Sequence, residues 1–198
     1  MVVKYNCLLI LFLSDFMSQR FAVIDTETNW NDEVMSIGIM IANSDNFKRI
    51  DSRYYILSQE ASIGGMFSST MYSTSHEIIE GSKSNIIDDL KHCLNSNNIN
   101  DLFAYNASFD KNHLPELSNF CWHDIMKIAA YKQYNKHIPK EVPCCSTGRM
   151  KRGYGVEPML NILGVDNYFE THNAIIDARD ELLIMKILDY DIDSYPKI

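Results

Sequence analysis

Apolar runs separated by polar turns divide the chain into short strands and helices. Three strands are predicted first, over residues 20–24, 33–42 and 47–57, each an apolar or alternating run of a length typical of a strand. Short polar connections such as residues 43–46 join them, which favours an antiparallel meander. The first part of the chain therefore predicts one side of a sheet.

The rest of the chain alternates helical and extended patterns. Ile86, Ile87, Leu90 and Leu94 recur at helical spacing after Ser84, which predicts a helix capped by that serine. The later predicted elements are a strand over 102–105, a helix from Ser108, a short strand over 120–122, a helix over 125–134, an ordered loop over 139–155, a short helix from Pro158 to Leu163 and an amphipathic helix over 174–188. This order predicts an α/β fold with a mixed five-stranded sheet, antiparallel on one side and parallel on the other, flanked by helices.

Two carboxylates stand directly after the first predicted strand. Asp25 and Glu27 are two positions apart, so a strand that continues through them projects both from one face. Neighbouring acids repel one another unless a cation lies between them, and hard divalent cations such as Mg²⁺ take oxygen ligands of this kind. By itself, such a pair is also typical of the start of a solvated loop.

Three further candidates lie at the ends of later elements. Asp110 opens the helix after the fourth strand, a place that active sites of open α/β sheets favour and that helix capping also explains. His172 stands at the entrance of the last helix, where a histidine is more often a surface or capped residue. Asp177 lies one turn inside that helix and borders its apolar stripe, where an acid needs a partner such as a metal.

Together these segments resemble, in order and spacing, the motifs of the DEDDh exonucleases, relatives of the proofreading subunit of bacterial replicative polymerases. The three motifs are D-x-E, met by Asp25-Thr26-Glu27 with Thr28 following, N-x-x-F-D, met by Asn106-Ala107-Ser108-Phe109-Asp110, and H-N-A-x-x-D-A, met by His172-Asn173-Ala174-Ile175-Ile176-Asp177-Ala178. The resemblance spans roughly residues 20–188. Tyr105 departs from it, because many relatives carry a histidine before the asparagine, and the loop over 143–155 matches no motif of the family.

The resemblance implies an RNase H-like fold and stepwise hydrolysis of phosphodiester bonds from a 3′ end, with two divalent cations, Mg²⁺ or Mn²⁺, as cofactors. The implied metal ligands are Asp25, Glu27, Asp110 and Asp177, with His172 as general base. The candidates for holding the terminal nucleotide are Thr26, Thr28, Asn106 and Phe109, for which packing and turn hydrogen bonds are equal alternatives and Phe109 is more often a core residue. The implied partners are nucleic acid with a free 3′ end, single-stranded or frayed, and a polymerase or another replication or repair protein.

Charge is distributed unevenly along the chain. The net charge of −8 argues against a general nucleic-acid coat. Between residues 127 and 152, however, seven basic residues face a single acid, Glu141: Lys127, Lys132, Lys136, Lys140, Arg149, Lys151 and Arg152. This basic segment is suited to carry phosphates past an active site, and a solvated helix face explains it equally well.

The cysteines and the N-terminal residues indicate the cellular compartment of the protein. Five cysteines without a C-x-x-C pair do not look like a secreted disulfide framework, so a reducing cytoplasm is expected. The apolar run within residues 1–16 is too short for a membrane span of about 20 residues and lacks a signal-peptide cleavage site. We expect a dispensable extension over 1–16, with a membrane anchor as the alternative, ahead of a single exonuclease domain over 17–198. No membrane partner is expected.

Two other classes of function compete with the exonuclease. One is a catalytically idle nucleic-acid-binding or polymerase-associated module on the same fold. It is disfavoured because an idle module has no physical need for four mutually repelling carboxylates. The other is a zinc hydrolase that uses Cys121, His123 and Cys144, whose spacing fits no common zinc pattern.

Overall fold

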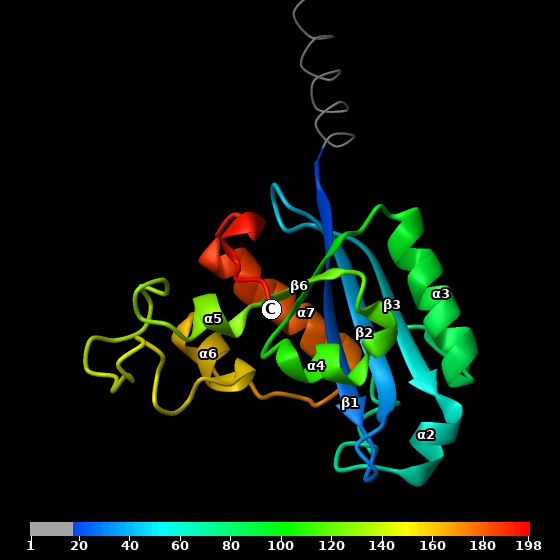
Figure 1. The fold of residues 1–198 in the computed structure, drawn as a ribbon. Coiled ribbons are helices and arrows are strands. Elements are labelled where there is room, and N and C mark those ends of the chain that lie inside the picture. Colours follow the sequence, from blue (N-terminus) through cyan, green and yellow to red (C-terminus); the bar gives the residue numbers. More distant parts are fainter. Residues whose placement is uncertain (1–17) are drawn as a thin grey trace, which may run out of the picture.

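The computed structural model of the chain describes residues 18–198, so the predictions for residues 1–16 lie outside the described residues. Its centre is a six-stranded mixed sheet with the order β4-β3-β2-β1-β5-β6 (Figure 1). The strands are β1 (Arg20–Thr28), β2 (Val34–Asn43), β3 (Arg49–Leu57), β4 (Ile78–Gly81), β5 (Asp101–Ala104) and β6 (Cys121–Asp124). The first three pair antiparallel, and the other pairings, β3 with β4, β1 with β5 and β5 with β6, are parallel. This confirms the predicted α/β class with an antiparallel and a parallel side.

The helices largely follow the predicted order. They are α2 (Ser58–Ile63), α3 (Lys83–Ser96), α4 (Ser108–His113), α5 (Met126–Ala129), α6 (Val156–Ile162) and α7 (Ala174–Leu188), with 3-10 turns at Pro115–Leu117 and Ile192–Ser194. The bounds of α7 are those predicted, whereas α3 is capped by Ser82 instead of Ser84. Within residues 18–198, no helix is long and apolar enough to cross a membrane.

Several elements differ from the prediction: α2 was not predicted, and β1 extends to Thr28. Two further differences, at β4 and α5, have identifiable physical reasons. The sheet has a sixth strand, β4, which pairs with Tyr54–Leu57 of β3; it is short, half-buried and at the sheet edge, so it leaves no clear apolar pattern in the sequence. The helix predicted over 125–134 ends at Ala129, because the buried side chain of Asn135 donates a hydrogen bond to the Ala129 carbonyl over 2.7 Å.

The sheet separates two apolar cores. Side chains alternate along β1, so Phe21 and Val23 enter one core while Ala22 and Ile24 enter the other. Figure 1 shows α5, α6 and α7 on one side of the sheet and α3 on the opposite side. β2 is buried on both faces, which explains its continuous apolar run.

A close backbone approach at Gly38 seats α7 on the sheet. A methyl group added at Gly38 of β2 would lie 2.1 Å from the carbonyl oxygen of Ala174, the first residue of α7. The absence of a side chain at this position therefore lets the start of α7 lie directly against β2.

Substituting Gly38 by alanine is expected to lower the free energy of unfolding by about 1–3 kcal/mol, the usual cost of overpacking. For a chain of this size, each kcal/mol corresponds to roughly 2–4 °C in melting temperature. Gly81→Ala is the matched control, because a methyl group there meets its nearest neighbour, a side-chain carbon of Ile86, at 3.6 Å. Thermal unfolding followed by circular dichroism compares the two, and equal melting temperatures would contradict the contact.

Candidate active site

β1 presents Asp25 and Glu27 on the sheet face that α7 covers. The strand continues to Thr28 instead of ending at Ile24, and its register places Asp25 opposite Gly38 of β2. Because Gly38 contacts the first turn of α7, Asp25 lies beside the start of that helix. The fold therefore brings the first pair of acids to the beginning of the last helix.

Asp110 reaches the same place from α4. After β5 ends at Ala104, Asn106 adopts a left-handed backbone conformation (φ 62°) that turns the chain into α4. The Thr26 hydroxyl then donates a hydrogen bond of 2.8 Å to the Asp110 carboxylate, and both side chains are buried. Thr26 thus holds Asp110 against β1.

His172 and Asp177 lie at the start of α7, next to Glu27. The potential ligand atoms of these three side chains are all within 4.8 Å of one another. The half-buried His172 ring stacks on Phe67, with ring centroids 3.9 Å apart and planes 17° from parallel. The Thr70 hydroxyl donates to the backbone carbonyl of His172. These contacts fix the imidazole at the edge of the acids.

Asn173 joins the start of α7 to the segment between α2 and β4, residues 64–77. Its backbone N–H donates to the Asp177 carboxylate over 2.9 Å. Its side-chain amide donates to the backbone carbonyls of Thr70 and Met71 over 2.8 and 3.1 Å. One residue therefore orients an acid of the cluster and fastens the neighbouring segment to it.

A fifth carboxylate, Glu181, belongs to the cluster although the sequence motifs do not include it. Glu181 follows Asp177 by four residues on α7, so the two side chains project from the same side of the helix. It is buried, with 2% of its surface exposed. Its i, i+4 spacing from Asp177 was the sequence signal that could have identified Glu181. Acids are common on helices, however, so an acid beyond the matched motif gave no reason to select it.

Burial and mutual repulsion raise the pKa values of these acids. Burial raises the pKa of Asp25 well above its ordinary value, and neighbouring charges raise it further, in the order Glu181, Asp110, Asp177 and Glu27. Burial raises the pKa of Asp110 to about 7. Burial, followed by the charge of Glu170, raises the pKa of Glu27 to about 7 and that of Asp177 to about 8.

The cluster has the properties of a metal-binding site. Asp25 Oδ2, Asp177 Oδ1 and Glu181 Oε2 are buried without a hydrogen-bond partner. None of the ion pairs formed among residues 18–198 involves the five acids. Buried carboxylates that no cationic side chain pairs are costly unless they bind a metal or a proton. The purely oxygen donor set fits Mg²⁺ or Mn²⁺.

In the absence of metal, stability is expected to fall as pH rises from about 4 to about 8. Glu27, Asp110 and Asp177 have folded-state pKa values of about 7, 7 and 8, above the ordinary values near 4 of the unfolded chain. The folded state therefore holds more protons than the unfolded state in this window, so the free energy of unfolding decreases with pH and levels off above it.

Added Mg²⁺ or Mn²⁺ is expected to offset this loss, so the metal-induced rise in melting temperature is larger at pH 8 than at pH 5. Thermal unfolding across this range, in EDTA and in metal, measures both effects. The control is Asp88→Asn, at an exposed position on α3, which is expected to show the same dependence of melting temperature on pH as the wild type. A melting temperature that rises with pH in EDTA would contradict the raised pKa values.

The four candidates for nucleotide contact occupy different environments. Thr26 is buried and bonded to Asp110, whereas Thr28 ends β1 and is half-buried. Asn106 is exposed, and its backbone N–H donates to Asp124. The interpretation of Phe109 as a core residue is wrong, because 40% of its surface is exposed. It follows Asn106 into the first turn of α4, where the backbone turn carries it to the surface.

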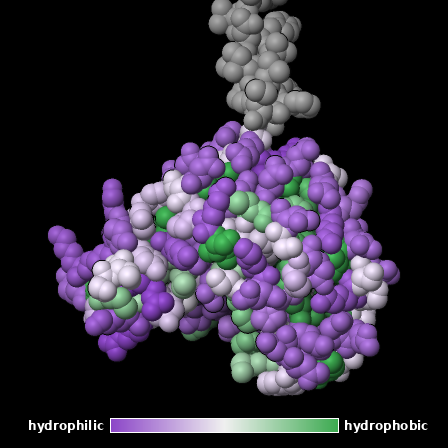
Figure 2. Space-filling view, viewed as in Figure 1, coloured by the Kyte–Doolittle hydropathy of each residue, from purple (hydrophilic) through white to green (hydrophobic). Residues whose placement is uncertain are grey.

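The basic segment over 127–152 runs through α5 and the irregular chain that follows it. This chain projects to one side of the molecule in Figure 1, and Figure 2 shows mostly hydrophilic residues there. Two residues beyond its far end, the Tyr154 carbonyl accepts a hydrogen bond from the Tyr105 hydroxyl over 2.6 Å. Tyr105 lies near Glu181, because burial and then the charge of Glu181 raise the pKa of the Tyr105 hydroxyl.

Among the described residues, the proposed zinc set of Cys121, His123 and Cys144 is not brought together. Cys144 lies in the loop after α5, where its backbone forms an isolated antiparallel β-bridge with Met150. The side chain that lies with Cys121 and His123 is instead Asp101.

Comparison with known proteins gives matches only among solved structures. No protein-family model matches the sequence, and no curated protein does. The nuclease domain of 3′hExo, a DEDDh family member, bound to rAMP, superposes with a TM-score of 0.64 at 13% identity, covering 91% of this chain and 96% of that one. A 3′-exonuclease solved for its recognition of the histone mRNA stem-loop has a TM-score of 0.63 at 12% identity, covering 98% and 77%.

A further similar structure is Exonuclease I of E. coli in complex with a dT13 oligonucleotide. Its TM-score is 0.56 at 12% identity, and the match covers 86% of this chain and 40% of the longer enzyme. These similarities confirm the predicted RNase H-like fold. The structural neighbours are nucleases, among them a DEDDh family member and a 3′-exonuclease, in agreement with the DEDDh resemblance of the three sequence motifs.

Proposed function

We propose that the chain is a metal-dependent 3′–5′ exonuclease that hydrolyses phosphodiester bonds at the 3′ end of nucleic acid. The observation that carries this proposal is the cluster of carboxylates from β1, α4 and α7, which none of the ion pairs among residues 18–198 involves, with a histidine at its edge. Its fold is one that solved 3′ exonucleases share. A catalytically idle binding module would keep the repulsion between these carboxylates without any catalytic benefit.

The acids would hold two divalent cations, Mg²⁺ or Mn²⁺. The proposed ligands are Asp25, Glu27, Asp110 and Asp177, and Glu181 adds a fifth negative charge beside them. Such a metal pair, when bound, stabilises the attacking and leaving oxygens of an in-line phosphoryl displacement. Thr26 orients Asp110 through its hydroxyl, and the Asn173 backbone orients Asp177.

His172 is proposed as the general base that takes a proton from the attacking water. Imidazole is the side chain suited to exchange a proton near neutral pH. Its ring lies within reach of Glu27 and Asp177, and stacking on Phe67 limits its rotation. His172 is half-buried, so part of the residue stays accessible to water and substrate.

Three exposed aromatic side chains that stand close to the acids along the chain are suited to stack on the terminal bases. Trp30 follows β1, Phe109 precedes Asp110, and Phe169 precedes Glu170; their exposed fractions are 67%, 40% and 76%. Base–aromatic stacking supplies about 1–3 kcal/mol per base without sequence preference. Thr28 and Asn106 lie at the same end of the sheet as further contacts, and the basic segment over 127–152 is proposed to hold backbone phosphates.

A reducing, cytoplasmic setting is proposed as well. Among the described residues the cysteines Cys93, Cys121, Cys144 and Cys145 are free thiols, which supports it. A polymerase or another replication or repair protein as partner stays a prediction.

Matched DNA and RNA oligomers labelled at the 5′ or the 3′ end test the proposal. With Mg²⁺ or Mn²⁺, the 5′-labelled strands are expected to give a ladder and the 3′-labelled strands to release the terminal nucleotide at once; in EDTA both stay intact. A pattern of internal cuts would contradict the exonuclease. Binding without cleavage would favour the idle module.

A further inference from the structure

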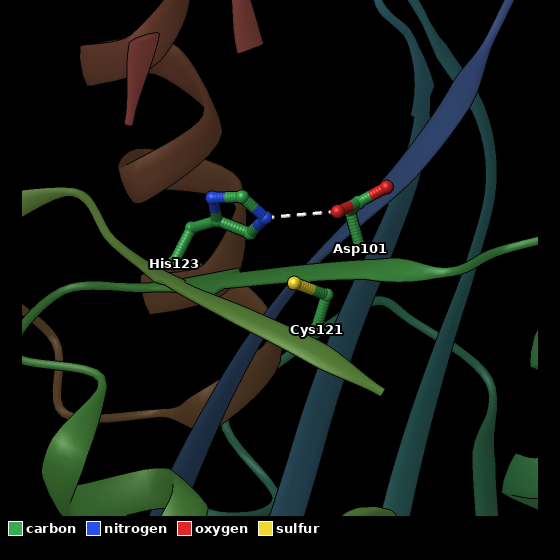
Figure 3. A group of neighbouring side chains, drawn as sticks. All are labelled: Asp101, Cys121 and His123. Carbon is green, nitrogen blue, oxygen red and sulfur yellow. Dashed lines mark hydrogen bonds and ion pairs between the residues drawn. The ribbon is translucent and has the colours of Figure 1, made fainter. Parts of the chain in front are cut away.

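A second group of potential metal ligands lies on the parallel strands β5 and β6. Asp101 is the first residue of β5, while Cys121 and His123 are the first and third residues of β6. The parallel register pairs Asp101 with Cys121 and Phe103 with His123. Since side chains alternate along a strand, all three project from one face of the sheet, as Figure 3 shows.

The three ligand atoms converge on one point. His123 Nε2 and Asp101 Oδ1 are 2.8 Å apart, and these two atoms and the Cys121 sulfur all lie within 4.8 Å of one another. His123 is almost fully buried, at 1% exposed, and its ring stacks on Phe103 with centroids 4.5 Å apart. Asp101 and Cys121 are half-buried, so the group is open to solvent on one side.

The orientation of the His123 ring is the decisive observation. Its Nδ1 lies 2.9 Å from the carbonyl oxygen of Tyr195, and a carbonyl only accepts, so Nδ1 carries a proton. In neutral imidazole the lone pair of Nε2 then points at the Asp101 carboxylate, which is also an acceptor. A cation between them resolves the conflict, and a histidine oriented by a backbone carbonyl is typical of metal ligation.

A protonated His123 paired with Asp101 is the competing explanation of the short contact. That ion pair needs no thiol, yet Cys121 points into the same space. Thiolate, imidazole and carboxylate are the three side-chain ligand types that Zn²⁺ takes, and three protein ligands leave a fourth position for water.

We propose that Asp101, Cys121 and His123 form a zinc site, separate from the acidic cluster, that ties β5, β6 and the C-terminal segment together. Binding displaces the thiol proton of Cys121 to solvent. Lys197 is exposed, so its ammonium group is free to move away from Cys121 when the cation enters. The proposal does not depend on the exonuclease activity.

The C-terminal segment is the part of the chain that such a site would stabilise. The carbonyl of Tyr195 accepts from His123, and Lys197 forms a bridge with the same residue of β6. The Ile198 N–H donates to the Trp122 carbonyl over 3.0 Å. Fixing His123 therefore fixes the last residues against the edge of the sheet.

Zinc retention by the purified full-length chain tests the site. After equilibration with Zn²⁺ and desalting, the wild type is expected to retain one zinc per chain, and Co²⁺ in its place is expected to show a thiolate-to-metal charge-transfer band. Cys121→Ser and Asp101→Asn are expected to lose both signals. Cys145→Ser is the thiol control. Asp25→Asn combined with Asp177→Asn is the control for metal at the acidic cluster. Both control proteins are expected to retain zinc and to show the charge-transfer band with Co²⁺.

Two results would overturn the proposal. One is a wild type that retains no zinc, and the other is zinc that survives Cys121→Ser but is lost with the acidic cluster. Because a substitution on β6 can unfold the chain, alkylation of the wild-type thiols is measured as well. Zinc is expected to slow alkylation of Cys121 at least tenfold, relative to Cys145 in the same sample. Equal rates with and without zinc would contradict the site.

Discussion

Asp25→Asn is expected to reduce metal-dependent cleavage of a labelled strand by about 10³-fold or more. Metal ions supply several kcal/mol of transition-state stabilisation in such reactions, and each 1.36 kcal/mol is a factor of ten in rate. Asp25 is the acid on which the charges of the four others act, so it has the central place in the proposed metal site. Initial rates on a 5′-labelled oligomer, in saturating Mg²⁺, measure the effect.

The same variant separates loss of chemistry from loss of folding. Asp25→Asn removes a carboxyl group whose ionised form burial and neighbouring charges disfavour in the folded state, so the metal-free variant is expected to melt at a higher temperature than the wild type at pH 8. Asp88→Asn, an exposed acid on α3, is the matched control and keeps full activity. An Asp25→Asn protein that still degrades the strand at the wild-type rate would remove Asp25 from the metal site.

His172→Ala is expected to lower turnover by about 10²–10⁴-fold, the usual contribution of a general base. Metal binding is expected to persist, because four carboxylates of the cluster do not depend on the imidazole. The rate in metal as a function of pH, with the metal-induced shift in melting temperature measured alongside, separates the two properties. The expected result is a strongly reduced rate at every pH, with the metal-induced shift in melting temperature retained.

An exposed histidine of α3 supplies the control for this change. His92→Ala is expected to leave both rate and metal response unchanged. If His172→Ala keeps the wild-type turnover, the general base lies elsewhere. If it loses the metal response together with the rate, His172 acts on the metals themselves, which its position beside Glu27 and Asp177 also permits.

The sequence predicted those parts of the fold whose burial is continuous. β2 is buried along nearly its whole length, and α7 has a wide apolar side, so their patterns were readable and the bounds of α7 were correct. The edge strand β4 was not readable, since a half-buried strand of four residues is specified by pairing with β3. The end of α5 was missed because the buried amide of Asn135 decides it.

The candidate site was predictable where a local motif carries each side chain. The motifs named five residues that the fold gathers near one another, because each lies near the end of a strand or the start of a helix. Glu181 was missed, since only the packing of α7 on β1 turns an ordinary helical acid toward Asp25. Asp101 was missed as a neighbour of Cys121 for a similar reason: the parallel register of β5 and β6 is a property of the folded sheet.

The hydrogen bonds of Asn173 constrain the length of the segment over 64–77 more than is usual for irregular chain. Loops of this kind ordinarily tolerate insertions and deletions. Here a change of length would move the carbonyls of Thr70 and Met71 that hold the Asn173 side chain, and the backbone of that residue holds Asp177. The segment is therefore expected to vary in sequence but not in length, and to be a poor site for grafted peptides or affinity tags.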